Sequence, residues 1–210
     1  MELLLSLAAF GVVNFLAAVS PGPDFFVVSK NSIGYSRRIG VYTALGVGCG
    51  IFVHVAYTIV GIGFVISQSV VLFSLIKVWG ALYLCYLGIK LLRSKSETNL
   101  LNASTEKETA EKTGWNAFGE GFLTNVLNPK AAVFFVSVFS QLVSPELPIV
   151  LQSLYGVEAA VIVAAWFVFL AVTLSYSKIV PVLNRFQSHI LKAMGGVLIL
   201  LGIRLAFSKQ

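Results

Sequence analysis

Charged residues are scarce in this 210-residue chain: Asp, Glu, Lys and Arg make up 11% of the sequence, against 57% hydrophobic residues. Soluble domains carry about 25% charged residues. Apolar runs recur along the whole length, so the composition predicts an all-α polytopic membrane protein rather than a soluble domain with one anchor. A cleaved signal peptide is not expected, because Glu2 is the only charge before the first apolar run and no basic segment precedes it.

Cysteine and histidine are also scarce, with two of each. Cys49 and Cys85 lie singly inside apolar runs and form no CxxC pair, which favours small packing residues over a redox or metal site. The sequence shows no Walker A loop, no cluster of His, Cys and carboxylates with metal-ligand spacing, and no recognisable Ser-His-Asp set. We therefore expect no cofactor, no ATP hydrolysis within this chain and no enzyme activity.

The basic residues give a net charge of +6, but they form no patch with interleaved aromatics, so no nucleic-acid partner is expected. Apolar runs predict six transmembrane helices, at 3–20, 39–66, 70–90, 115–143, 149–174 and 190–208. The connections after the first, third and fifth spans hold 11 of the 15 basic residues. By the positive-inside rule, these connections face the cytoplasm and both termini face outward, with Arg204 and Lys209 as mild exceptions.

The first apolar run is interrupted by Ser20-Pro21-Gly22-Pro23-Asp24. Proline removes a backbone donor and clashes with the preceding turn. In a bilayer such a break is tolerated only where protein or a water-filled cavity satisfies the freed backbone groups. Ser20 suits an N-cap with Pro21 at the first helical position, which would place Asp24 one turn into a second half-helix. We expect the free N–H groups of that half-helix to point into the membrane interior.

A second break, Asn128-Pro129-Lys130, stands 108 residues after the first, and Phe-Phe-Val follows the proline in both. Gly88-Ile89-Lys90-Leu91 and Gly202-Ile203-Arg204-Leu205 match at an offset of 114 residues. These offsets predict one transmembrane domain built from two three-helix repeats, about 1–93 and about 114–210, joined by a polar linker at 94–113. Because three is odd, the repeats are inverted, with Pro-broken helices 1 and 4, a pattern typical of secondary transporters. Chance similarity among common residues is the alternative.

Polar residues at the two breaks are the candidate substrate site. A buried carboxylate is costly unless paired, so Asp24 is predicted to bind a substrate ammonium group or to carry a proton, with helix stabilisation as the plain alternative. The half-helix N-termini suit a substrate carboxylate. Lys130 could assist them or reach the cytoplasmic surface instead. The predicted substrate-binding residues are Ser20, Pro21, Gly22, Pro23, Asp24, Asn125, Asn128, Pro129 and Lys130.

Three further ionisable residues lie within the predicted spans. Glu158, in the fifth span, is predicted with Asp24 to take part in proton coupling, and an interhelical hydrogen bond is its alternative. His54 could relay protons or pack, and Glu120 is expected near the cytoplasmic interface. The sequence leaves the roles of these residues open.

Three segments together resemble the LysE/RhtB family of amino-acid exporters. They are Pro21-Gly22-Pro23-Asp24, then Gly121-Phe122-Leu123-Thr124-Asn125 running into Asn128-Pro129-Lys130-Ala131, and Trp79-Gly80-Ala81-Leu82-Tyr83-Leu84 with Gly88. The resemblance is greatest to the RhtB branch and implies export of threonine, homoserine, homoserine lactone, leucine or related neutral amino acids. It also implies a bacterial inner membrane, six helices and efflux driven by the proton-motive force.

The sequence thus predicts a secondary exporter of small neutral amino acids, working by proton antiport. Its expected partners are the amino-acid substrate, protons and the lipid bilayer, and the oligomeric state, a homo-oligomer included, stays open. A membrane channel or a metal or ion efflux protein of similar fold is the main alternative. A membrane enzyme or thiol-redox carrier is disfavoured by the single, scattered cysteines.

Overall fold

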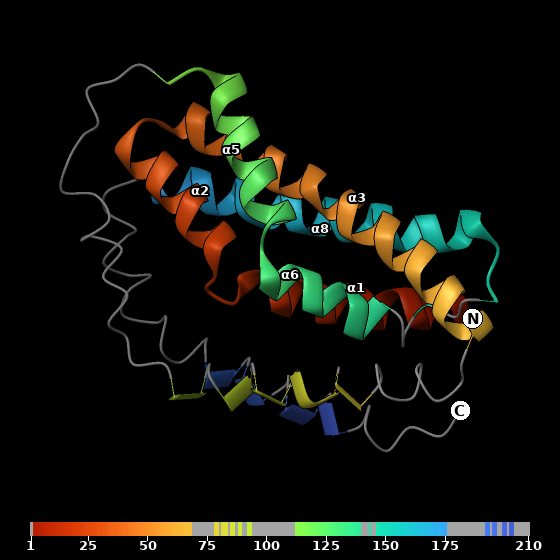
Figure 1. Ribbon diagram of the computed structural model, residues 1–210. Helices are drawn as coiled ribbons and strands as arrows, with labels where there is room; N and C mark the ends of the chain where they lie inside the picture. The colour runs from red at the N-terminus through yellow and green to blue at the C-terminus, as the bar shows by residue number, and fades with distance from the viewer. Residues whose placement is uncertain are drawn as a thin grey trace.

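The computed structural model describes residues 2–68, 112–139, 143 and 146–175, together with isolated helical positions within 78–93 and 192–203. Helices dominate the described chain (Figure 1). They are α1 (Glu2–Val19), α2 (Pro23–Gly34), α3 (Arg37–Gln68), α5 (Gly114–Val126), α6 (Pro129–Phe134), the π-helical η2 (Phe135–Phe139) and α8 (Ile149–Leu174).

Two of these helices, α3 and α8, are each long and apolar enough to cross a membrane. Two more spans arise if each bent pair counts as one: α1 with α2, bent by 60°, and α5 with α6 and η2, bent by 48°. The bounds of α8 match the predicted span 149–174, and α3 extends the predicted 39–66 by about half a turn at each end. The spans predicted at 70–90 and 190–208 and the linker up to residue 111 lie largely outside the described residues, so the six-span inverted repeat stays a prediction.

The first break corrects the sequence-based expectation. Helix α2 starts at Pro23, not Pro21, and its N-cap is Gly22, which is extended (φ −170°, ψ −175°) and makes no side-chain cap. Ser20 is therefore not the cap, and Asp24 is the second residue of α2 rather than one turn into it. A residue before proline is disfavoured in the α conformation, so the two consecutive X-Pro pairs delay the helix until the second proline. If α1 and α2 count as one span, that span continues past residue 20 to Gly34.

The second break follows its prediction. Asn128 is the N-cap of α6, where its side chain accepts a 3.0 Å hydrogen bond from Lys130 N, and Pro129 occupies the first helical position. Proline fits there because its missing N–H would have no partner within the helix. The helix then continues as η2, a π-helical turn of a kind often found at functional sites.

The two broken helices run antiparallel, and their breaks lie level with each other. Contacts between them pair rising residue numbers in one with falling numbers in the other: Phe10 with Phe139, Ala17 with Lys130, Asp24 with Asn125, and Asn31 with Glu120. Figure 1 shows the same arrangement, with α6 lying along α1 and α5 along α2. The two regions of unpaired backbone therefore face each other within the helix bundle.

Helix α3 packs against both α5 and α8 at backbone distance. A Cβ added at Gly46 would stand 2.1 Å from Phe118 O on α5, and one at Gly48 would stand 2.6 Å from the Ala164 Cβ on α8. Small residues allow this close approach, as is common between membrane helices. Helix α3 thus packs closely against α5 on one side and α8 on the other.

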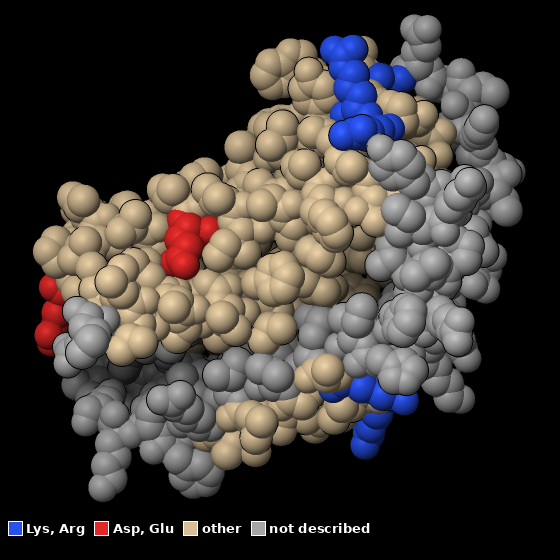
Figure 2. Space-filling model, turned by 180° about the vertical axis from the view of Figure 1, so that it is seen from behind, with Lys and Arg blue, Asp and Glu red and all other residues tan. Residues whose placement is uncertain are grey.

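The outer surface suits a lipid environment. Large apolar side chains are exposed on several helices, among them Leu4 at 72%, Val60 at 74% and Val150 at 73%. Figure 2 shows a largely uncharged face, with Lys and Arg gathered toward one side and acidic residues toward the other. The orientation of the termini stays a prediction.

Candidate functional site

A small buried cavity lies where the two breaks face each other. Its volume is about 40 Å³, enough for about three water molecules. One end is polar and the rest mostly apolar. Its lining comprises Asn14, Ala17, Ala18, Ser20, Gly22, Asp24, Phe25, Ile51, Asn125, Asn128, Lys130, Ala131, Phe134, Phe135, Val163 and Phe167. The cavity therefore brings together six of the nine predicted substrate-binding residues: Ser20, Gly22, Asp24, Asn125, Asn128 and Lys130.

Asp24 is the carboxylate of this cavity. It is 9% exposed, and its Oδ2 accepts hydrogen bonds of 2.9 Å from the Nδ2 atoms of both Asn125 and Asn128. Asn125 lies in the last turn of α5 and Asn128 is the N-cap of α6, so the second break brings both amides to Asp24. Its other oxygen, Oδ1, has no hydrogen-bond partner among the described residues. The same holds for Asn125 Oδ1 and Ser20 Oγ, so the polar end of the cavity presents buried acceptor atoms that call for a donor.

Lys130 reaches inward rather than toward the cytoplasmic surface. Its Nζ donates to Ala17 O at 2.9 Å and to Ser20 O at 2.6 Å, where α1 ends. Carbonyls at a helix end lack partners within the helix, so Lys130 satisfies them and stabilises the negative end of α1. The ammonium also lies beside the start of α2, because a Cβ added at Gly22 would stand 3.4 Å from Nζ.

His54 holds the last turn of α5 in place. Its Nε2 lies 2.9 Å from Asn125 O and its Nδ1 lies 2.7 Å from Tyr57 OH. A carbonyl can only accept, so Nε2 carries the hydrogen and Nδ1 accepts from the Tyr57 hydroxyl. The ring also stacks on Phe135, with centroids 5.7 Å apart. Both nitrogens are engaged, which favours a positioning role for His54 over a proton relay.

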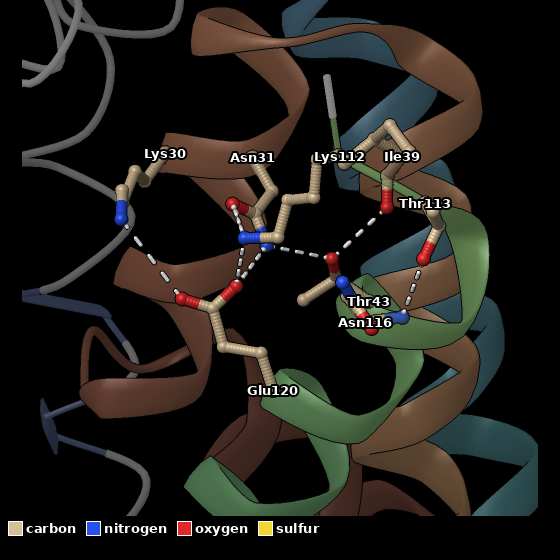
Figure 3. Close-up of polar contacts among 8 residues, drawn as sticks. All are labelled: Lys30, Asn31, Ile39, Thr43, Lys112, Thr113, Asn116 and Glu120. Atoms are coloured by element: carbon tan, nitrogen blue, oxygen red, sulfur yellow. Dashed lines mark hydrogen bonds and ion pairs between the residues drawn. The ribbon is translucent and has the colours of Figure 1, made fainter. Parts of the chain in front are cut away.

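A polar cluster joins α2, α3 and α5 between the cavity and the basic end of these helices (Figure 3). Lys112 donates to Glu120 and, at 3.0 Å, to Asn31 Oδ1. The Asn31 amide in turn donates to Thr43 Oγ1 and to Glu120 Oε2, both at 2.8 Å. Lys30 adds a 3.9 Å ion pair with Glu120. Since Glu120 precedes Asn125 by about 7.5 Å along α5, this cluster holds α2 against α5 next to the cavity.

Glu158 lies apart from Asp24. It lines neither described cavity, and it faces α1, where a Cβ added at Gly11 would stand 2.6 Å from Glu158 Oε1. Its Oε2 is buried and has no partner among the described residues. The geometry therefore offers no direct contact between the two carboxylates predicted for proton coupling.

A second, larger cavity of about 640 Å³ lies beside α6 and η2. Its described lining is mostly aromatic and aliphatic: Tyr57, Trp79, Leu82, Tyr83, Tyr86, Ala132, Val133, Val136 and Ser137. Tyr83 OH donates to Lys130 O at 3.2 Å, which ties this wall to α6. No charged residue stands among its described lining residues.

Sequence reasoning missed two buried asparagines. Asn14 lines the cavity and is 2% exposed, and Asn31 is fully buried within the cluster of Figure 3. A signal for Asn14 was present, because an amide within the apolar run Leu3–Val19 is expensive in a membrane unless it has a partner. Asn31 gave no such signal, since it stands in a polar stretch near a turn.

Several known proteins are similar to this chain over most of its length. The model of one family, described as LysE type translocator, matches residues 15–209. The threonine efflux protein of Escherichia coli (strain K12) is 34% identical over 171 residues, covering 80% of this chain and 82% of its own. That of Salmonella typhi is 32% identical over 200 residues, covering 94% and 96%. The uncharacterized membrane protein YrhP of Bacillus subtilis (strain 168) is 31% identical over 211 residues, covering 97% and 99%. No solved structure matches the chain.

Proposed function

Because the chain belongs to the LysE type translocator family, we propose that it exports a small neutral amino acid across a bacterial inner membrane in exchange for protons. The observation that carries the proposal is the buried cavity between two level, antiparallel helix breaks, with Asp24 in its wall. Discontinuous helices that meet near the middle of a membrane are where secondary transporters bind their substrates.

The ammonium group of the substrate binds at the acceptor atoms of the polar end. Asp24 Oδ1, Asn125 Oδ1 and Ser20 Oγ are buried without a partner among the described residues. An ammonium group has three N–H donors and a positive charge, so it can satisfy this set of atoms and offset the cost of the buried carboxylate. Asn125 and Asn128 hold Asp24 in position from its other oxygen.

The carboxylate of the substrate binds at the start of α2. No side chain caps this helix, and the Lys130 ammonium lies beside its N-cap Gly22. A helix N-terminus and a lysine charge both favour an anion. The start of α6 is less suited, because Asn128 already caps it. Pro21 and Pro23 shape the first break and Pro129 the second, rather than binding substrate through polar atoms.

The substrate is an amino acid of modest size with an uncharged side chain. Among the described residues, the apolar part of the cavity offers Ile51, Phe135 and Val163 but no second charge for an acidic or basic side chain. The relatives named as threonine efflux proteins support a substrate of this class. An amino acid is larger than about three waters, so binding must widen the cavity.

Proton coupling follows if Asp24 holds either a proton or an ammonium group. A proton bound to Oδ1 neutralises the carboxylate and removes its attraction for the substrate, while a bound ammonium excludes the proton. Substrate then leaves the cell in one direction and a proton enters in the other. Glu158, which does not line the cavity, is proposed as a second proton acceptor on the α1–α8 side.

Alternating access follows from the inverted repeat proposed for 1–93 and 114–210, with the basic connections facing the cytoplasm and both termini outward. The Lys112–Glu120 cluster then closes the cytoplasmic side of the cavity in the described state. Opening that side requires α2 and α5 to separate there.

Uptake of labelled amino acids into inverted membrane vesicles tests the proposal. Vesicles containing the protein should accumulate a small neutral amino acid beyond control vesicles, and a proton gradient, acidic inside, should increase the uptake. Uptake equal to control vesicles across all neutral amino acids would refute export. Ion conductance or metal flux without amino-acid uptake would favour the channel or metal-efflux alternative.

A further inference from the structure

Asn14 is a buried amide in the cavity wall that the proposed ammonium and carboxylate sites do not use. It lies on α1 and is 2% exposed. Its Nδ2 donates to Ala159 O on α8 at 3.2 Å. Because a carbonyl can only accept, this bond fixes the orientation of the amide and leaves Oδ1 as the atom able to accept from a ligand in the cavity.

The position of Asn14 suits the side chain of a substrate rather than its charged groups. It stands six residues before Ser20, or about 9 Å along α1. The antiparallel contacts place it near the level of Phe134 and Phe135, in the apolar part of the lining. An amino acid anchored by its ammonium at Asp24 therefore extends its side chain toward Asn14.

We propose that Asn14 is a specificity-determining residue that accepts a hydrogen bond from a side-chain hydroxyl of the substrate. The inference rests on the proposed function and names its substrate class as hydroxylated neutral amino acids. Apolar walls cannot strongly separate two side chains of equal shape that differ by a hydroxyl, whereas a buried hydrogen-bonding group can. A neutral hydrogen bond corresponds to a preference of roughly two- to tenfold.

Threonine and valine provide the probe, because their side chains have nearly the same shape and differ by a hydroxyl in place of a methyl group. Uptake of each labelled amino acid is measured in inverted vesicles at several concentrations. The unmodified protein should favour threonine. Asn14→Leu, which keeps a similar volume without the acceptor, should lower the threonine-to-valine ratio roughly two- to tenfold, with valine uptake retained.

Ser29→Ala is the matched control, because Ser29 is also buried without a partner for its hydroxyl among the described residues but does not line the cavity. It should leave the ratio unchanged. Asn14→Ala gives the same ratio test should the leucine variant fail to accumulate. An unchanged ratio in the Asn14 variants, or equal loss of both substrates, would overturn the proposal and leave Asn14 as a tie between α1 and α8.

The failure of this inference is distinct from the failure of the proposed function. An unmodified protein that transports both amino acids without preferring threonine contradicts the role of Asn14 alone. An unmodified protein that transports neither these nor any other neutral amino acid contradicts amino-acid export itself.

Discussion

Gly50 of α3 lies directly against Asn125, so replacing it with alanine should displace an amide that holds Asp24. A Cβ added at Gly50 would stand 2.6 Å from Asn125 Oδ1, 2.9 Å from its Cβ and 3.0 Å from its Cγ. Contacts of this length are repulsive. Rotation about the side-chain bonds cannot relieve them all, because the Asn125 Cβ is fixed to the backbone of α5. Either the side chain of Asn125 or the packing of α3 on α5 must therefore change.

The size of the effect follows from two terms. Overpacking of this kind typically costs about 1–3 kcal/mol of stability. Loss of the hydrogen bond from Asn125 to Asp24 removes a contact to a charged group, which is typically about 1.5–3 kcal/mol. At about 1.4 kcal/mol per factor of ten, the second term corresponds to a loss of substrate affinity of about ten- to a hundredfold. The higher helix propensity of alanine, about 1 kcal/mol, cannot restore the bond.

The assay is concentration-dependent uptake of labelled threonine into inverted vesicles, combined with thermal unfolding of the purified protein. Gly61→Ala is the control, because Gly61 lies on the same helix and an added Cβ meets nothing within 4 Å. This control should transport as the unmodified protein does, with stability equal or higher by up to about 1 kcal/mol. Unaltered transport by Gly50→Ala would refute the reasoning that Asn125 positions Asp24.

Three further substitutions test the surroundings of the cavity. Lys112→Met removes a donor shared by Glu120 and Asn31 and should lower the free energy of unfolding by about 1–2 kcal/mol. The loss should be seen as a lower thermal midpoint in detergent. An unchanged midpoint would mean that the cluster does not hold α2 to α5. Asn128→Ser keeps a capping oxygen but loses the amide donor to Asp24, so transport should fall and the free energy of unfolding should drop by about 1.5–3 kcal/mol. Asn128→Ala should lose about 1 kcal/mol more stability through the missing cap, and equal stability of the two variants would contradict the capping role.

The sequence was informative wherever a single strong local preference decided the structure. The mostly apolar segment predicted as a span at 149–174 became α8 with the same bounds. Asn128 before Pro129 combined a good cap with the residue that best starts a helix, and α6 begins there. The pairing of the two breaks also followed from their matching offsets.

The first break was predicted less well because two prolines compete for the helix start. The local preference of Ser20 for capping yields to the restriction that Pro23 imposes on Gly22, so the helix begins two residues later. The inward course of Lys130 could not be deduced either, because it depends on the end of α1 lying beside α6. The link from Lys112 to Asn31 likewise joins residues far apart in the chain.

Transport by Asp24→Asn tests the central claim most directly, because this change keeps the shape of the side chain and removes both its charge and its ability to exchange a proton. The measurement is uptake of labelled threonine into inverted vesicles with and without a proton gradient, beside Ser29→Ala as a matched buried variant outside the cavity lining. The account predicts that the Asp24→Asn carrier loses stimulation by the gradient and that the Ser29→Ala carrier keeps it. Full gradient-driven uptake by Asp24→Asn would contradict the account.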